Sequence, residues 1–153
     1  MRIIFLLSLI FILSGARSFY PVNQAEIEVV LNNIKNARGV FVISFYNDAK
    51  SFPKPGKDAF TEKVRVNDTM ARSVKFKLPA AGWYAIAMFQ DEDESGKIKQ
   101  DKIGYLLEAY AFSNNVRPKL AAPGFAACKF YVSENNNSPF IISLIQPKIG
   151  RKK

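Results

Sequence analysis

The fold is decided by a stretch that reads Leu78-Pro-Ala-Ala-Gly-Trp-Tyr-Ala-Ile-Ala-Met-Phe-Gln90, then Asp91-Glu-Asp-Glu-Ser-Gly-Lys-Ile-Lys-Gln-Asp101, and closes with Glu108-Ala-Tyr-Ala-Phe-Ser-Asn-Asn115. The proline and glycine at its start predict a turn, and both alternating sets of side chains in 83–89 are apolar. A strand that is apolar on both faces belongs in the middle of a sheet covered on two sides. The acidic residues that follow predict a loop with oxygen ligands.

Six further segments have the patterns of strands. They alternate charged with apolar residues or are rich in β-branched and aromatic residues: 25–31, 40–46, 61–66, 72–78, 125–132 and 140–145. Residues 103–120 have no clean period and predict an ordered long loop, with one helical turn at 106–110. About seven short strands with hairpin-type turns predict an all-β protein, an antiparallel β-sandwich of the immunoglobulin-like or prealbumin-like type.

Composition limits the possible functions. The chain has 153 residues, of which 48% are hydrophobic, and this suits a single domain over 19–147. It contains no histidine, which excludes Ser-His and Cys-His nucleophile pairs and the commonest zinc ligand. The single cysteine, Cys128, has no partner in the chain and is expected to be a small buried hydrophobic residue.

The N-terminal residues 1–18 have the pattern of a signal peptide. Arg2 precedes the apolar run 3–13, and the small residues of 14–18 allow cleavage after Ala16 or after Ser18. The sequence therefore predicts an exported protein, periplasmic or extracellular, with no transmembrane anchor after cleavage. Cleavage after Ser18 removes two arginines and lowers the formal charge from +9 to +7.

The remaining positive charge favours an acidic partner. Residues 148–153 form a basic C-terminal tail, which suits an envelope polyanion or a glycan, while solubility alone is the simpler explanation. Because the protein is expected to be exported, no nucleic acid is expected. The sequence does not predict the oligomeric state.

The acidic loop 91–101 matches the first half of a calcium-binding loop. The pattern needs oxygen ligands at the first, third and fifth positions, glycine at the sixth and a carbonyl at the seventh, and five residues meet it: Asp91, Asp93, Ser95, Gly96 and Lys97. The twelfth position is Lys102 instead of a bidentate glutamate, and Asp101 is the nearest substitute. The loop is interpreted either as a calcium site of Asp91, Asp93, Ser95, Lys97 and Asp101, or as a solvated turn neutralised by its lysines.

Two classes of function remain open. In the first, the sandwich is a non-catalytic binding or structural module whose ligand lies against side chains of the long loop, with Tyr105, Glu108, Tyr110, Phe112 and Asn114 as candidates. In the second, the protein is a hydrolase acting on an extracellular glycan, with an acid and a base drawn from Asp91, Asp93, Asp101 and Glu108. A concave, aromatic-lined cleft holding two of these carboxylates favours the enzyme.

Three motifs in this order resemble those of a family of secreted bacterial proteins, the domain of unknown function numbered 2141. They are the turn and strand from Leu78, the loop from Asp91 to Lys97, and the segment Glu108–Asn115. The resemblance covers essentially the whole mature chain and implies an exported sandwich without assigned catalytic residues. Where the family's loop continues to an aspartate, this chain has Lys99.

Overall fold

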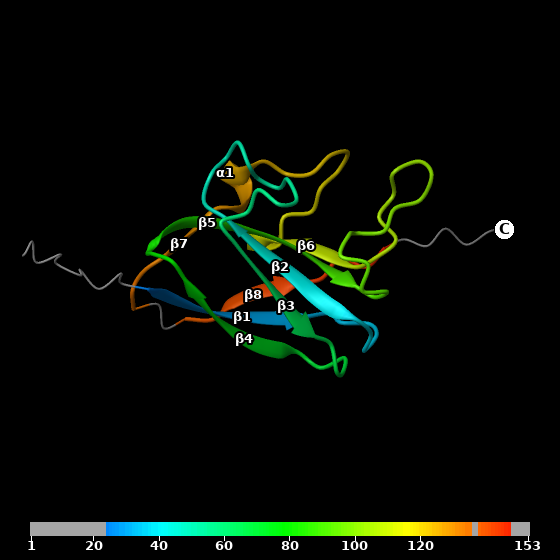
Figure 1. The fold of residues 1–153 in the computed structure, drawn as a ribbon, viewed down its shortest axis with the longest axis horizontal. Coiled ribbons are helices and arrows are strands. Elements are labelled where there is room, and N and C mark those ends of the chain that lie inside the picture. Colours follow the sequence, from blue (N-terminus) through cyan, green and yellow to red (C-terminus); the bar gives the residue numbers. More distant parts are fainter. Residues whose placement is uncertain (1–23, 136–137, 148–153) are drawn as a thin grey trace, which may run out of the picture.

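Two β-sheets pack face to face in the computed structural model of the chain, which describes residues 24–135 and 138–147 (Figure 1). The three-stranded sheet has the order β4-β1-β8, and in the larger sheet β3-β2-β5-β6 follow one another, with β7 also paired to β5. The strands are β1 Ala25–Asn32, β2 Val40–Tyr46, β3 Phe60–Arg65, β4 Arg72–Leu78, β5 Gly82–Asp91, β6 Tyr110–Phe112, β7 Phe130–Val132 and β8 Phe140–Ser143. The predicted signal peptide and basic tail lie outside the described residues.

The sandwich class predicted from the sequence is confirmed, with one change in strand direction. The pairs β1–β4, β2–β3, β2–β5, β5–β6 and β5–β7 are antiparallel, but β8 pairs with β1 in parallel. Direction cannot be read from a strand's own residues, because the alternation of side chains is the same in both arrangements.

β5 is central and covered on both faces, as its sequence predicts. Tyr84, Ile86 and Met88 point into the core between the sheets. On the other face, Ala85 lies in a second buried cluster that includes Phe52 from the loop after β2 and Cys128. Figure 1 shows this loop and the short helix α1, Phe125–Cys128, on the side of β5 opposite to β1 and β8.

Three local predictions are wrong. Residues 125–128 form α1 and not the first half of a strand, although Cys128 is buried as expected. The helical turn predicted at 106–110 is absent, because Ala109 and Tyr110 continue in extended pairing with β5 and Leu106 bridges to Gln100. Trp83 is 52% exposed, since it lies outside the second cluster and packs on Tyr131 at a ring distance of 5.5 Å.

The side chains of the 3-10 turn η1, Ser113–Asn115, join three other elements, β5, α1 and β8. Buried Ser113 accepts a hydrogen bond from the Ile86 N–H at 2.8 Å and donates one to the Cys128 carbonyl at 2.6 Å. Asn115 donates to the Ile141 carbonyl and accepts from the Ser143 N–H. The turn therefore fixes where β6 ends, where α1 lies and how β8 approaches.

Candidate functional site

Two buried carboxylates face each other where β5 ends. β5 and β6 pair Phe89 with Tyr110, and the same register places Asp91 opposite Glu108. Asp91 is fully buried and Glu108 is 3% exposed. Like charges directly opposite on paired strands destabilise a sheet, and buried charges need strong partners.

The loop after β5 supplies those partners from its backbone. The Asp91 carboxylate accepts the N–H groups of Ser95 at 3.0 Å and Gly96 at 2.8 Å. The Glu108 carboxylate accepts those of Glu92 at 2.9 Å and Lys99 at 2.8 Å. Four peptide dipoles thus offset the burial of two carboxylates, and they give the loop its shape.

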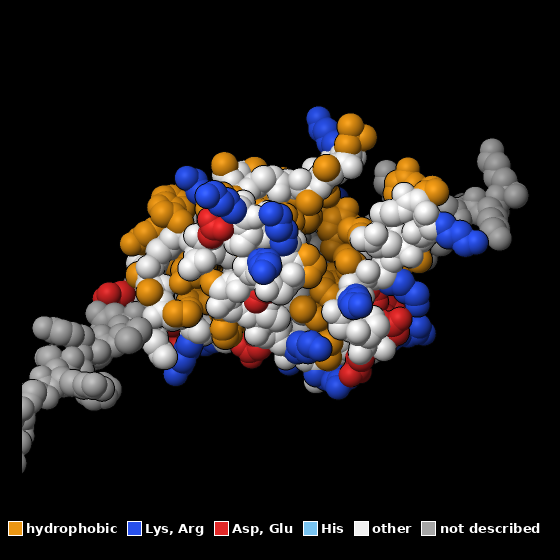
Figure 2. All heavy atoms as spheres, turned by 45° about the horizontal axis from the view of Figure 1, so that its top comes forward, with side chains coloured by type: hydrophobic (Ala, Val, Ile, Leu, Met, Phe, Trp, Pro, Cys, Tyr) orange, Lys and Arg blue, Asp and Glu red, His pale blue; other side chains and the backbone are white. Residues whose placement is uncertain are grey.

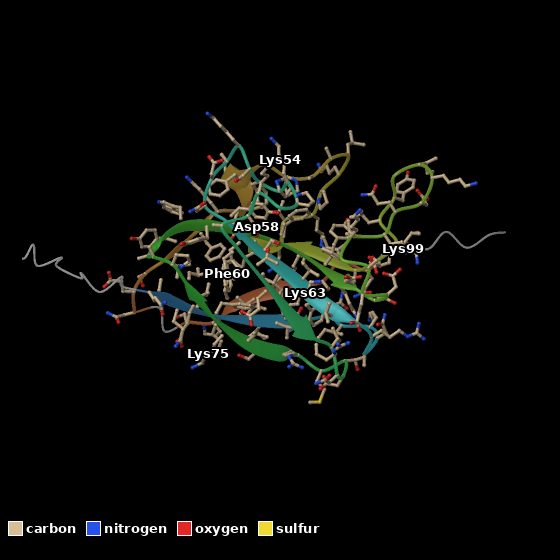
Figure 3. All side chains as sticks on the ribbon, in the orientation of Figure 1. Lys54, Asp58, Phe60, Lys63, Lys75 and Lys99 are labelled. Atoms are coloured by element: carbon tan, nitrogen blue, oxygen red, sulfur yellow. The ribbon has the colours of Figure 1, made fainter. Side chains whose placement is uncertain are left out.

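Asp93 completes what we call the acidic group, Asp91, Asp93 and Glu108, which brings one oxygen of each residue within 4.8 Å of the others. Asp93 is exposed, and its pKa is lowered first by the hydrogen bond from Ser95 and then by Lys99. The Lys99 ammonium lies 3.1 Å from Asp93, on the loop that projects beyond β5 (Figure 3). Hydrogen bonds and an ion pair therefore both favour the charged form of the Asp93 carboxyl group.

The structure brings together only part of the predicted calcium set. Asp91, Asp93 and Ser95 are neighbours, and the Ser95 hydroxyl donates to the Lys97 carbonyl at 3.1 Å. Asp101 lies apart from the acidic group and accepts the N–H groups of Ile103 and Tyr105. Glu108, which the sequence placed among ligand-binding candidates, is the third carboxylate instead.

An open groove of about 1020 Å³ lies beside the acidic group. One wall is the hairpin of residues 100–107, which projects from the body, and the other is the loop 117–122. Tyr110, on β6, and Ile145, which follows β8, form the floor between them and exchange two backbone hydrogen bonds. Figure 2 shows hydrophobic side chains gathered in the hollow between the projecting segments.

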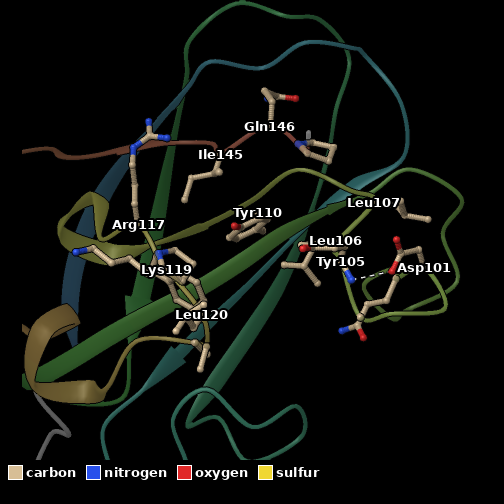
Figure 4. Close-up of a pocket in the computed structure, with 17 residues that line it drawn as sticks. Asp101, Tyr105, Leu106, Leu107, Tyr110, Arg117, Lys119, Leu120, Ile145 and Gln146 are labelled. Carbon is tan, nitrogen blue, oxygen red and sulfur yellow. Dashed lines mark hydrogen bonds between the residues drawn. The ribbon is translucent and has the colours of Figure 1, made fainter. Parts of the chain in front are cut away.

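Three of the five predicted ligand-binding residues line the groove. They are Tyr105, Tyr110 and Phe112, and Tyr105 is 69% exposed at the rim. Figure 4 shows Arg117 and Lys119 on the side opposite Asp101, with Tyr110 between them. The sequence did not single out the two cations, since only the fold brings the loop that carries them next to the hairpin.

The other two predicted residues have structural partners. Asn114 adopts a left-handed conformation with φ of 58°, and its amide donates to the carbonyls of Ala127 and Lys129. Glu108 belongs to the acidic group, and a small cleft of about 330 Å³ there is lined by Glu92, Asp93, Lys99, Leu107 and Glu108.

Within the described residues, the paired carboxylates Asp93 and Glu108 therefore lie apart from the aromatic rings of the groove. The groove has the tyrosines and Asp101, while the small cleft has Asp93 and Glu108 without an aromatic residue. Both oxygens of Glu108 already accept backbone N–H groups. Neither hollow combines a sugar-stacking surface with a pair of candidate acid and base residues.

Cys128 is also unsuited to catalysis. Burial raises the pKa of its thiol to about 11, so the thiolate is scarce at neutral pH.

Within residues 24–135 and 138–147, no helix is long and apolar enough to cross a membrane.

Comparison with known proteins gives a family but no relative of known role. No curated protein and no solved structure matches the chain. A family model matches residues 29–139, which run from β1 to the turn before β8 and include both the acidic group and the hydrophobic floor of the groove at Tyr110. The chain thus belongs to the family DUF2141, described as an uncharacterized protein conserved in bacteria.

Proposed function

We propose that the protein is an exported, non-catalytic binding module, working in the periplasm or outside the cell, whose ligand occupies the groove. The observation that carries the proposal is the groove itself, an open hollow with Tyr105 and Tyr110 exposed to it and polar side chains at its edges. Ligand sites are typically concave and mostly apolar, with a few polar groups that fix orientation.

A glycan hydrolase is the alternative function. The small cleft favours it, because that cleft contains two carboxylates, Asp93 and Glu108. The proposal favours binding because Glu108 holds the loop through both of its oxygens, and a catalytic acid needs a free oxygen within reach of the substrate. The aromatic groove, where a sugar would stack, contains Asp101 but neither Asp93 nor Glu108.

The test measures binding of a panel of neutral and acidic oligosaccharides by the wild type and by Tyr105→Ala. We expect at least one member to bind, and Tyr105→Ala to weaken that binding about fivefold or more, the usual cost of truncating an interface anchor. Tyr131→Ala is the matched control, because Tyr131 is similarly exposed, at 55%, but lies on β7 outside the groove.

Equal loss of affinity in the two tyrosine variants would argue against the groove. Release of reducing ends that disappears in Glu108→Gln would establish the hydrolase instead. For export, mass spectrometry of the mature protein should give Phe19 or Arg17 as the first residue, and a retained Met1 would contradict it.

The proposal includes a calcium ion at the acidic group. Its carboxylates, together with the Ser95 hydroxyl and the Lys97 carbonyl, are the hard oxygen donors that calcium prefers. Two oxygens that bind one calcium ion at about 2.3–2.6 Å are at most about 5 Å apart, which agrees with the 4.8 Å spacing. The ion would neutralise the two buried carboxylates, Asp91 and Glu108, which face each other. It would also compete with the Lys99 ammonium for the Asp93 carboxylate.

Calcium at about 1 mM should stabilise the wild type by about 1.4 kcal/mol if the dissociation constant is about 10⁻⁴ M, as in weak extracellular modules. This corresponds to a rise in melting temperature of roughly 4–8 °C over the same protein in chelator, and magnesium should have a smaller effect. Glu108→Gln, Asp91→Asn and Asp93→Asn should each abolish the calcium-dependent difference, whereas Asp101→Asn should keep it. Equal melting curves in calcium and chelator would identify the loop as a solvated turn.

A further inference from the structure

We infer that the ligand of the groove is an acidic polysaccharide whose carboxylate groups are bound by Arg117 and Lys119. The inference rests on the proposed function, and names the chemical class that the groove selects. It follows from three features of the groove: unpaired cations on one wall, a carboxylate on the other, and tyrosine rings between them.

The two cations of the groove have no partner among the described residues. Arg117 and Lys119 are both exposed, and no carboxylate of the described ranges lies within ion-pair distance of either. Arg65, Lys75 and Lys99, by contrast, each contact a carboxylate. Two free cations that share one wall of a concave site attract anionic groups, and arginine can bind a carboxylate through two parallel hydrogen bonds.

The opposite wall argues against an anionic polymer that has no hydroxyl groups, such as polyphosphate. Asp101 lines it, and its Oδ1 atom accepts the N–H groups of Ile103 and Tyr105. Within the described residues no hydrogen bond reaches its Oδ2 atom, which is therefore available to accept a hydroxyl hydrogen. A ligand that places carboxylates at Arg117 and Lys119 and hydroxyls at Asp101 fits both walls, and each ring of a uronic acid chain carries a carboxylate together with hydroxyls.

The tyrosines supply the surface for the sugar rings. Tyr105 stands at the rim of the groove and Tyr110 lies partly buried in its floor, 6.1 Å from the ring of Phe112. Tyrosine presents a rigid apolar face together with a polar hydroxyl, which suits the faces and edges of a pyranose. Gln146 lines the same hollow and adds an amide that can meet ring hydroxyls.

The experiment uses calorimetry with two pairs of short oligosaccharides: oligogalacturonate and oligomannuronate, each as the free acid and as its methyl ester. The ester keeps the ring and removes the charge. We expect at least one acid form to bind, with its ester about tenfold weaker or more. Arg117→Gln and Lys119→Gln should each weaken binding of the acid about fivefold or more and leave the ester unchanged, while Tyr105→Ala should weaken both forms.

Lys63→Gln is the matched control for overall charge, because Lys63 is exposed on β3, away from the groove (Figure 3). The Lys63→Gln variant should bind the acid like the wild type, and polyphosphate should bind to the wild type more weakly than the acid.

Equal affinities for acid and ester, with both lost in Tyr105→Ala, would overturn the inference and leave the proposed function standing. Failure of both acid forms would also overturn it, and failure of every oligosaccharide in the panel would overturn the proposed function too. A loss in Lys63→Gln as large as in Lys119→Gln, or tighter binding of polyphosphate, would likewise overturn the inference.

Discussion

Gly39→Ala is expected to lower the free energy of unfolding by about 4 kcal/mol or more, among the largest effects of a single substitution. Gly39 has a φ of +64°, which disfavours any residue with a Cβ atom. A Cβ atom at this position would lie 1.8 Å from the carbonyl oxygen of Asp91, so the backbone of the β5 terminus would have to move. The neighbouring pair Val40–Asp91 belongs to the β2–β5 ladder, and this movement would disturb the acidic group as well.

Gly56→Ala separates the clash from the conformational cost. Gly56 also has a positive φ, +72°, but no atom lies within 4 Å of the position its Cβ would take. This variant should lose only about 1 kcal/mol in chemical denaturation. Similar losses in the two variants would mean that the contact between Gly39 and Asp91 is not tight in solution.

Ile86→Ala should cost about 2–5 kcal/mol of stability, as truncation of large core side chains does. Ile86 is fully buried between the sheets on the central strand β5 and lies opposite Phe45 of β2. The cavity cannot collapse easily, because β5 is held on both edges and on both faces.

The same substitution at Ile141 is the control. Ile141 is 53% exposed on β8, so Ile141→Ala should change the free energy of unfolding by less than about 1 kcal/mol. Urea denaturation of both variants provides the comparison. A loss below about 1 kcal/mol in Ile86→Ala would contradict the central position of β5.

The sequence predicted the sandwich because the alternation of side chains within a segment is enough to identify it as a strand. The apolar residues on both faces of 83–89 were sufficient to place β5 in the centre. The same reasoning failed at 125–128, where alternation is compatible with a strand, but α1 forms and its Cys128 carbonyl accepts a hydrogen bond from the distant Ser113 hydroxyl. Trp83 is exposed because the burial of a side chain near the end of a strand depends on what packs against it, and not on the type of residue.

The sequence predicted only part of the candidate site, for a related reason. Counting along the loop found Asp91 and Asp93, which are close in the chain, and suggested Asp101 as the next oxygen ligand. The structure supplies Glu108 instead, across the strand pair. Only the pairing of Phe89 with Tyr110 reveals this neighbour, and a register cannot be fixed from one strand alone. Arg117 and Lys119 had no local signal at all.

The amide of Asn114 has a consequence for how a ligand would enter the groove. It donates to the carbonyls of Ala127 and Lys129, and thereby fastens the beginning of the loop 116–124 to its end. Across the hollow, Asp101 holds the turn that carries Tyr105. Both walls are thus preorganised by contacts internal to the chain, so a ligand loses little affinity to ordering the protein, and the free and bound backbones should be nearly superimposable.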